Sequence, residues 1–471
     1  MVFNSFAYLA FFVTIVCLYF LTPARWRWVV ILCGSYFFYM SWRPEFGLLL
    51  FGTTLVDWYL ALVMARQQTP LRKKLVLALA VAANISVLFF FKYFDFATSS
   101  LWSLFGYSDP LVLNILLPIG ISFYTFQSIA YMVDVYRKDL QPERNFFRYA
   151  TFVSFFPHLV AGPILRPANI LPQIRQHKEW SAENLKIGLF YIATGLIKKV
   201  VIADRLGVFV DQVYLQPELY SGATLLAATY LFAFQIYCDF SGYTDIAIGS
   251  ARILGYTIPD NFRQPYFSQS LTEFWRRWHI SLSSWLRDYL YIPLGGNRKG
   301  TVRTYANLLI TMFLGGLWHG AAWTFVIWGL LHGLYLAAER FIAKLAGADA
   351  GARSKSYWAA ALRVLVAFNL VSFAWIFFRA DSLDDALYII KSIFGHFGTL
   401  YSPTIPLTSL ALYGILILVL LAFDYWQGHE RAAEKFAALK WYWRWPLAYA
   451  AIFGLIFFAA QSGAQFIYFQ F

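Results

Sequence analysis

The sequence predicts an all-α protein that crosses a membrane many times, with about 11–13 transmembrane helices and further re-entrant or in-plane helices. Two observations predict this class, the composition and the pattern of apolar residues. Of 471 residues, 60% are hydrophobic, 20% aromatic and only 13% charged, which is more apolar surface than one soluble core can bury. Apolar residues also run continuously instead of alternating, as the strands of a membrane barrel would require.

Uncharged runs that approach or exceed the ~20 helical residues needed to span the hydrocarbon layer recur along the whole chain. The clearest cover residues 1–22, 110–133, 219–238, 305–338, 392–423 and 446–471. Shorter apolar runs lie around 28–42, 46–65, 75–94, 149–165, 187–197 and 364–378, and two of these contain one charged residue each, Asp57 and Lys92. These runs leave little room for a soluble domain, and no linker or internal repeat divides the chain. We therefore expect one membrane-embedded domain over residues 1–471.

The basic residues indicate a topology. The net charge of +13 comes from short basic clusters between apolar runs, which follows the positive-inside rule and argues against a nucleic-acid-binding face. Basic clusters near residues 25–27, 72–74 and 137–148 follow the first, third and fifth runs. This order of basic clusters predicts that the amino terminus lies outside. The first span lacks a basic start and a small-residue cleavage site, so we expect it to be retained and not removed as a signal peptide. Simple alternation fails between residues 149 and 217, where we expect re-entrant or in-plane helices.

His319 is the strongest candidate for chemistry. It lies in the motif from Leu314 to Trp323, inside a stretch without Asp, Glu, Lys or Arg between Arg303 and Glu339. An ionisable residue at membrane depth is expensive and is therefore a functional candidate. An imidazole can accept a proton from a hydroxyl near neutral pH, and the neighbouring glycines permit a broken helix and close helix approach. A histidine that only hydrogen-bonds across helices is the alternative.

A second histidine, His279, lies in a segment rich in tryptophan and arginine that includes Arg276, Arg277 and Trp278. The pattern predicts an in-plane amphipathic helix, and a membrane-surface anchor accounts for most of it. The following turn contains Asn297 and Arg298. Such a turn can receive a phosphorylated donor such as coenzyme A, although an ordinary basic loop has the same composition.

Two carboxylates, Asp239 and Asp245, also interrupt an apolar run. An unpaired carboxylate there would be costly, so both need partners. Salt bridges to nearby arginines that lock the bundle are favoured over a direct substrate role. Their spacing does not match a metal site, and the three cysteines lack the CxxC or Cys/His spacing that holds zinc. We therefore expect no metal.

These motifs resemble the membrane-bound O-acyltransferase family, specifically its bacterial alginate O-acetyltransferase branch. The resemblance rests on Trp278-His279 and Leu317-Trp318-His319-Gly320, and extends to residues 117–124, 156–163, 237–245, 273–281 and 285–291. The segment 237–245 adds Ser241 beside Asp239 as a candidate for the site or tunnel. The resemblance covers about residues 1–340, with a signature core over about 110–340.

The resemblance implies that His319 is the catalytic histidine and that His279 is the second signature residue, within a central tunnel. It further implies that acetyl-CoA enters from the cytoplasm as a donor substrate, with no permanently bound cofactor. His319 would act as general base on an acceptor hydroxyl or thiol, while His279 or a nearby donor polarises the thioester carbonyl. Trp318, Trp278 and the polar residues named above are candidates for the donor site or the tunnel.

The resemblance also implies a multi-pass protein of the bacterial inner membrane that works with a periplasmic acetyltransferase-like partner. The acceptor would be a secreted polysaccharide, most simply an alginate-like exopolysaccharide. Peptidoglycan O-acetylation and D-alanyl transfer from a carrier protein are alternatives within the same fold. A transporter or flippase is the alternative from another class, and inverted repeats, which the sequence lacks, would favour it.

Overall fold

The computed structural model describes residues 1–107, 109–160, 162–347, 351, 353–354, 356–401, 406–429, 432–459 and 466–467. These residues form helices and no strand, which confirms the predicted all-α class. The chain divides into two compact units. Unit 1 comprises Met1–Ile192 with Ile246–Pro259, and unit 2 comprises Ala193–Asp245 with Asp260–Phe471.

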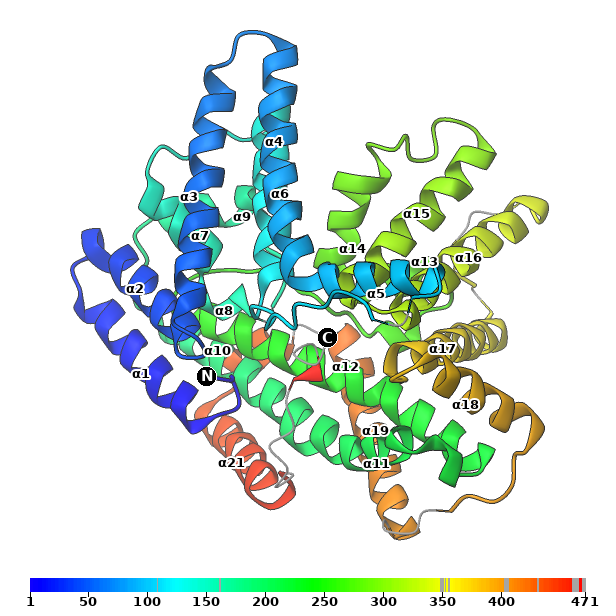
Figure 1. Cartoon of the computed structure of the whole chain (residues 1–471). Helices are drawn as coiled ribbons and strands as arrows, with labels where there is room; N and C mark the ends of the chain where they lie inside the picture. Colours follow the sequence, from blue (N-terminus) through cyan, green and yellow to red (C-terminus); the bar gives the residue numbers. More distant parts are fainter. Residues whose placement is uncertain are drawn as a thin grey trace. The chain divides into compact units, whose positions relative to one another are not determined.

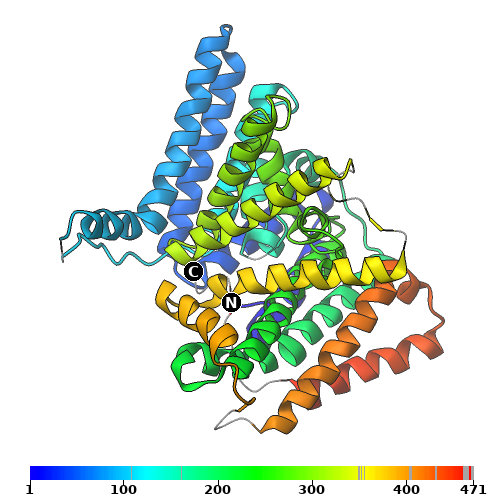
Figure 2. The same cartoon turned by 90° about the vertical axis from the view of Figure 1, so that its right-hand side faces the viewer.

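The helices of unit 1 come from the first part of the chain (Figure 1). They are α1 (Phe6–Leu21), α2 (Arg27–Met40), α3 (Glu45–Arg66), α4 (Pro70–Leu88), α5 (Phe94–Leu104), α6 (Ile121–Arg137), α7 (Phe146–Ser154), α8 (Phe156–Leu159), α9 (Pro167–Arg175) and most of α10 (Ala182–Leu196). The blue helices α3 and α4 run side by side as an antiparallel hairpin (Figure 2). Thr69 caps α4 by accepting from the Arg72 N–H, and Pro70 occupies the first turn, where its missing N–H costs nothing.

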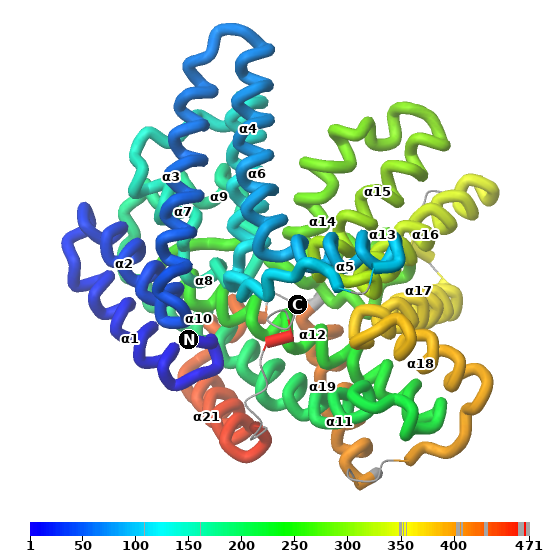
Figure 3. Tube along the Cα trace, viewed as in Figure 1, coloured from blue at the N-terminus to red at the C-terminus, as the bar shows by residue number. Residues whose placement is uncertain are grey.

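Unit 2 contains the remaining helices. They are α11 (Asp204–Leu215), most of α12 (Gly222–Ile253), α13 (Leu271–Arg277), α14 (Ile280–Leu286), α15 (Thr301–His319), α16 (Trp323–Leu345), α17 (Tyr357–Arg379), α18 (Leu383–Gly395), α19 (Leu407–His429), α20 (Ala432–Ala438) and α21 (Trp441–Phe458). Figure 3 follows the chain from α14 through the turn at residues 292–300 into α15 and back along α16. The uncharged run at residues 305–338 is therefore a helical hairpin.

Short single-turn and π-helical segments connect or interrupt these helices. They are η1 (Ala24–Trp26), η2 (Phe89–Tyr93), η3 (Ile197–Ala203), η4 (Pro217–Leu219), η5 (Pro265–Phe267) and η6 (Arg287–Tyr291). The π-helical η3 carries two lysines into the interior of unit 2, where Lys198 and Lys199 are both buried. π-Helical turns inside α-helices frequently mark functional or strained positions.

Six helices among the described residues are long and apolar enough to cross a bilayer. They are Glu45–Arg66, Pro70–Leu104, Gly222–Ile253, Trp323–Leu345, Tyr357–Arg379 and Thr408–Gln427. The chain is therefore a multi-pass membrane protein. The count of about 11–13 spans, the central tunnel and the outside amino terminus stay predictions.

The structure differs from the sequence prediction over residues 110–133. No helix forms before Ile121, because Pro118 lacks a backbone donor and Gly120 adopts a left-handed conformation with φ +77°. The carboxylate of Asp95 instead accepts hydrogen bonds from the N–H groups of Leu113 and Asn114, at 2.7 and 3.0 Å. The uncharged run is therefore a looped segment followed by α6. Further along, the described residues between 149 and 217 form several short helices, and their re-entrant or in-plane placement stays a prediction.

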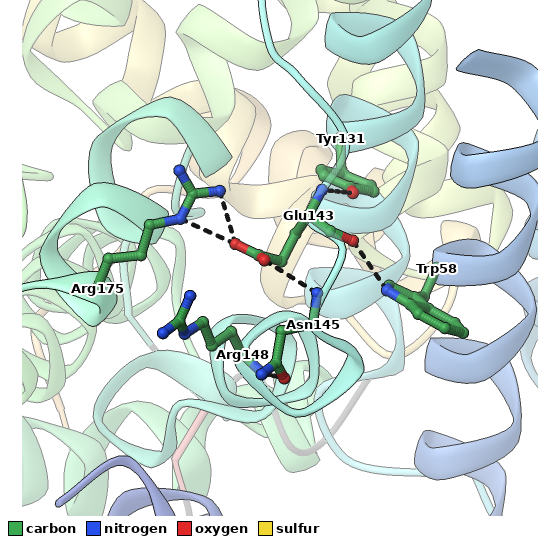
Figure 4. A network of polar contacts seen from close by, with 6 residues as sticks. All are labelled: Trp58, Tyr131, Glu143, Asn145, Arg148 and Arg175. Atoms are coloured by element: carbon green, nitrogen blue, oxygen red, sulfur yellow. Dashed lines mark hydrogen bonds and ion pairs between the residues drawn. The ribbon is translucent and has the colours of Figure 1, made fainter. Parts of the chain in front are cut away.

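One buried carboxylate organises the polar contacts of unit 1 (Figure 4). Glu143 accepts from the Arg175 guanidinium, with an Nη2–Oε2 distance of 2.6 Å, and from the Asn145 N–H at 3.0 Å. Its own N–H lies 2.8 Å from the Tyr131 hydroxyl, to which it donates, and its carbonyl accepts from the Trp58 indole at 2.9 Å. One residue thereby links α3, α6 and α9 to the start of α7.

Candidate active site

The hairpin of α15 and α16 places His319 at the end of a helix. The helical backbone stops there because Gly320 adopts an extended conformation, with φ −156° and ψ +150°. Gly316 lets the two helices approach closely, since a Cβ at this position would lie only 2.3 Å from the Phe325 carbonyl oxygen. The glycines around His319 thus break the helix and permit close packing, as the sequence predicted.

His319 is buried in an aromatic cage, with 4% of its surface exposed. Its ring centroid lies 5.0 Å from those of Trp318 and Trp328 and 5.4 Å from that of Phe378. The three contacts are edge-on, with interplanar angles of 71–85°. The cage draws on α15, α16 and α17, so the position of His319 is determined by three helices of unit 2.

His279 occupies a break where the sequence predicted one continuous in-plane helix. α13 ends at Arg277 and α14 begins at Ile280, and His279 between them has φ +43° and ψ +54°. A left-handed conformation is uncommon for a residue other than glycine, and such strain concentrates at functional sites. The carboxylate of Glu339 on α16 accepts from the Leu271 N–H at 2.7 Å, which anchors the start of α13.

The two histidines lie beside each other. Their ring centroids are 6.4 Å apart with an interplanar angle of 63°, and Trp318 contacts both rings. Phe240 of α12 packs edge-on against His279 at 4.7 Å. His279 is fully buried, and this burial lowers its pKa to about 3, so the ring is neutral at physiological pH. The structure thus brings His279 together with Trp318 and His319, although His279 and His319 are 40 residues apart in the sequence.

Asn261 and Ser281 complete this arrangement, although neither was among the site residues that the sequence predicted. The Asn261 carboxamide oxygen accepts from the Ser281 N–H at 3.0 Å and from the Ser281 hydroxyl at 2.8 Å. The same oxygen lies 3.3 Å from His279 Nδ1. Asn261 belongs to a loop 18 residues before His279, so no periodic spacing links the two residues.

Comparisons with known proteins show the family of this chain. The model of the membrane-bound O-acyltransferase family matches residues 137–380, a range that contains both histidines. A probable alginate O-acetylase, AlgI of Azotobacter vinelandii, is 43% identical over 427 residues, which cover 88% of this chain and 83% of the relative. The chain belongs to the membrane-bound O-acyltransferase family. It is therefore an O-acyltransferase.

Two further relatives of this acyltransferase carry different names. The peptidoglycan O-acetyltransferase of Helicobacter pylori is 39% identical over 394 residues, covering 78% of this chain and 73% of the relative. The teichoic acid D-alanyltransferase of Bacillus subtilis is 27% identical over 322 residues, covering 64% of this chain and 76% of the relative. The family resemblance inferred from the sequence is confirmed.

The residues predicted to receive the donor lie in different places within the acyltransferase. Arg276 lines a pocket of about 470 Å³ together with Arg287 and Arg340. Arg277 lines another pocket, of about 710 Å³, and pairs with Glu273 at 2.8 Å. Asn297 and Arg298 are exposed in the turn before α15 and line neither pocket. The structure therefore does not gather the four predicted donor-binding residues into one site.

The 470 Å³ pocket lies close to the histidines without reaching them. Its wall includes Ile280, the neighbour of His279, and Trp275. The Trp275 ring lies 5.8 Å from that of Trp328, which in turn contacts His319. Neither this pocket nor the 710 Å³ pocket is lined by a histidine of the pair. Two aromatic rings in contact, Trp275 and Trp328, thus connect the wall of this pocket to His319.

The remaining candidates are packed inside unit 2. Asp239 pairs with Lys199 at 2.6 Å, and Asp245 pairs with Lys198 at 2.8 Å. The predicted ion pairs exist, but the partners are lysines of η3 and not arginines. Ser241 is buried, and its hydroxyl has no hydrogen-bond partner among the described residues. Trp278 is also buried, and it packs against Phe274 and Trp375 instead of either histidine.

Proposed function

We propose that this acyltransferase moves an acetyl group from cytoplasmic acetyl-CoA across the bacterial inner membrane, for O-acetylation of an extracytoplasmic polysaccharide. The observation that carries the proposal is the pair of buried imidazoles, His279 and His319, held 6.4 Å apart by aromatic residues of unit 2. Acyl transfer to a hydroxyl needs a group that accepts the hydroxyl proton, and a histidine suits that task near neutral pH. Acetyl-CoA is consumed in this transfer as a substrate, and the proposal includes no resident metal or cofactor.

In this reaction the His319 ring takes the proton of the acceptor hydroxyl while the hydroxyl oxygen attacks the thioester carbonyl carbon. The carbon–oxygen bond forms and the carbon–sulfur bond breaks, and the thiolate leaves with the proton that His319 returns. Burial of the ring supports this role, since a dry site strengthens the interactions of the developing charges and limits hydrolysis of the thioester. A positioned general base contributes about 10²–10⁴-fold to such a rate.

The arginine-lined pocket is the best-supported entrance for the donor. Arg276, Arg287 and Arg340 supply positive charge for the phosphates of coenzyme A. The cavity of about 470 Å³ falls within the ~300–1,000 Å³ range of small-molecule sites. The thioester would then pass the Trp275 side of the pocket toward the histidines. Passage requires the rings of Trp275 and Trp328 to move apart.

The names of the relatives support polysaccharides as the acceptor class. An alginate-like exopolysaccharide is the leading acceptor, because probable alginate O-acetylases are 43% identical to this chain. Peptidoglycan is the second candidate, supported by the 39% identity to a peptidoglycan O-acetyltransferase. D-Alanyl transfer has weaker support, at 27% identity. We propose that a periplasmic acetyltransferase-like partner receives the acetyl group and delivers it to the polysaccharide.

A transfer assay with the purified full chain tests this function. The protein is reconstituted in vesicles. Acetyl-CoA that carries a radiolabel in the acetyl group is added on the side of the membrane predicted to be cytoplasmic, where the basic loops are expected. The expected result is release of free coenzyme A and loss of label from the thioester when a hydroxyl acceptor is present. His319→Ala should reduce this turnover by at least about 100-fold while the protein keeps its size-exclusion profile and thermal unfolding temperature.

The alternatives give different results in the same assay. A transporter or flippase would move its substrate without cleaving the thioester. A D-alanyltransferase would leave acetyl-CoA intact and act on a D-alanyl carrier protein. Wild-type turnover in His319→Ala would contradict the assignment of the base, and no thioester cleavage by the wild-type chain would contradict acetyl-CoA as donor.

A further inference from the structure

The carboxamide of Asn261 has a determined orientation. Its oxygen accepts from the Ser281 backbone N–H at 3.0 Å, and a backbone N–H can only donate. The atom that faces Ser281 and His279 must therefore be the oxygen and not the amide nitrogen. Asn261 is buried, with 1% of its surface exposed, and its amide nitrogen has no hydrogen-bond partner among the described residues. Among the described residues, only the oxygen of this side chain makes hydrogen bonds.

This orientation decides which nitrogen of His279 carries the proton. His279 Nδ1 lies 3.3 Å from the Asn261 oxygen and 3.4 Å from the Ser281 hydroxyl oxygen. The Asn261 oxygen can only accept, and the Ser281 hydroxyl already donates its hydrogen to that oxygen at 2.8 Å. Both atoms beside Nδ1 are therefore acceptors, so Nδ1 is the donor.

The other nitrogen is then left with a lone pair. The buried ring is neutral and holds one proton, which the contacts place on Nδ1. Nε2 has no hydrogen-bond partner among the described residues, and His279 is fully buried. A buried acceptor without a donor is costly, and native structures keep such groups where a ligand or water completes them. The missing partner must be an O–H or N–H donor.

We propose that Asn261 is a positioning residue that holds His279 in the Nδ1–H tautomer, so that Nε2 accepts a hydrogen bond from an O–H or N–H group of the acyl acceptor other than the hydroxyl that His319 deprotonates. This inference deepens the proposed function and rests on it for the identity of the donor group. It assigns His279 to the acceptor substrate, because a thioester carbonyl oxygen can itself only accept and cannot bond to an unprotonated nitrogen. The group that polarises the carbonyl is then a residue other than His279.

Nitrogen-15 NMR of histidine-labelled protein measures the tautomer directly, because protonated and unprotonated ring nitrogens resonate in separate ranges. The His279 signals are identified by their absence in His279→Gln. The expected wild-type spectrum has a protonated Nδ1 and an unprotonated Nε2. In Asn261→Ala the Nε2–H tautomer should become populated, whereas Asn261→Asp should keep the wild-type tautomer, since its carboxylate also accepts from Nδ1–H.

Steady-state kinetics give the second readout. Asn261→Ala should lower kcat for acetyl transfer at least tenfold with little change in the KM for acetyl-CoA, and Asn261→Asp should recover most of the loss. Ser281→Ala is the matched comparison for the NMR measurement, because it removes one hydroxyl but keeps the backbone N–H that orients Asn261. It should retain the Nδ1–H tautomer.

The two readouts separate failure of this inference from failure of the proposed function. A protonated Nε2 in the wild-type protein, or an unchanged tautomer in Asn261→Ala, would overturn the role of Asn261 whatever the activity. If Asn261→Ala does not fold, the Nδ1 and Nε2 signals of the wild type and of Asn261→Asp still decide the question. Absence of acetyl transfer in the wild type would contradict the proposed function alone.

Discussion

Gly316 and Gly329 bring the backbones of α15 and α16 into contact. A Cβ on Gly316 would lie 3.0 Å from the Gly329 Cα, and a Cβ on Gly329 would lie 2.3 Å from the Met312 carbonyl oxygen. A side chain at either position therefore forces the two helices apart. Because His319 follows Gly316 by less than one helical turn, the hairpin geometry and the position of the imidazole depend on each other.

We expect Gly316→Ala to destabilise the protein by about 1–3 kcal/mol, the usual cost of overpacking, and to reduce acyl transfer. Gly414→Ala in α19 is the control, because a Cβ there meets no atom within 4 Å. That substitution should be neutral or slightly stabilising, since alanine favours a helix more than glycine does. Thermal unfolding and the transfer assay check both variants. Wild-type stability in Gly316→Ala would show that α15 and α16 can separate without cost.

The sequence predicted those features that depend on local pattern. Apolar runs predicted the helices, and the glycines beside His319 predicted the helix break and the close helix approach there, because both signals lie within a few residues of the structure they determine. The contacts of His279 could not be predicted this way. The break at His279 and its contact with Asn261 depend on a loop 18 residues away, and the amphipathic pattern of the segment favoured a continuous helix.

The sequence predicted that the two buried carboxylates pair with cations, but it did not predict which residues supply them. A carboxylate in an apolar run needs a cation, and the sequence therefore indicated ion pairs for Asp239 and Asp245. The choice of Lys199 and Lys198 follows from η3, a π-helical segment whose placement depends on tertiary packing. Proline and glycine effects likewise explain why the run at residues 110–133 forms no helix before Ile121.

His332 should be dispensable for transfer. Its ring stacks on Phe274 with an interplanar angle of 8° and contacts Trp275 and Trp328 at 5.0 and 4.9 Å. Neither ring nitrogen has a hydrogen-bond partner among the described residues. Replacing such an unsatisfied polar ring by an apolar ring is nearly neutral or stabilising. We expect His332→Phe to keep transfer within about twofold of the wild type, because general acid–base catalysis would instead cost about 100-fold or more.

The same substitution at His319 provides the comparison. His319→Phe should abolish transfer, since phenylalanine fills the cage but cannot accept a proton. The transfer assay and thermal unfolding are measured on both variants. Loss of transfer in a well-folded His332→Phe would assign His332 a part in proton transfer.

The buried ion cluster around Lys199 should stabilise the fold. Its charges predict that Lys199→Met destabilises the protein more than Asp239→Asn does. Lys199 pairs with Asp204 at 2.8 Å and with Asp239 at 2.6 Å, and all three side chains are at least 96% buried. Lys199→Met would leave two buried carboxylates without this cation, which costs about 3–5 kcal/mol or more. Asp239→Asn should cost less, because Lys199 still pairs with Asp204 and the amide oxygen can still accept from the Ile467 N–H.

Unfolding by denaturant in detergent micelles measures the loss of stability in Lys199→Met and in Asp239→Asn. The direct substrate role considered for Asp239 predicts a different outcome. In that case Asp239→Asn would lose transfer while retaining wild-type stability. Equal destabilisation by the two variants would contradict the charge argument.

Glu143 should contribute more to the stability of unit 1 than its partner Arg175 does. Glu143 is buried and receives hydrogen bonds from both Arg175 and the Asn145 N–H, whereas the Arg175 side chain is 46% exposed. Glu143→Ala removes both bonds and should cost about 1.5–3 kcal/mol. Arg175→Ala leaves the bond from Asn145 and lets water solvate the carboxylate, so its cost should be smaller. Thermal unfolding of both variants checks the order, and a larger effect of Arg175→Ala would contradict it.

Arg276 should govern the affinity for the donor. Arg276 and Arg298 are both exposed, but Arg276 lines the pocket that Arg287 and Arg340 also line, whereas Arg298 lies in the turn before α15 and lines neither pocket. Losing one charge-assisted contact to a phosphate corresponds to at least about 1.5 kcal/mol, or roughly a tenfold change in binding. We expect Arg276→Gln to raise the KM for acetyl-CoA about tenfold with little change in kcat, because the phosphates lie far from the reacting carbonyl. Raising the salt concentration should weaken donor binding less in this variant than in the wild type, since one ionic contact is gone.

Arg298→Gln is the comparison variant. A raised KM for acetyl-CoA in Arg298→Gln, with a normal KM in Arg276→Gln, would show that the donor binds at the turn before α15 and not in the arginine-lined pocket.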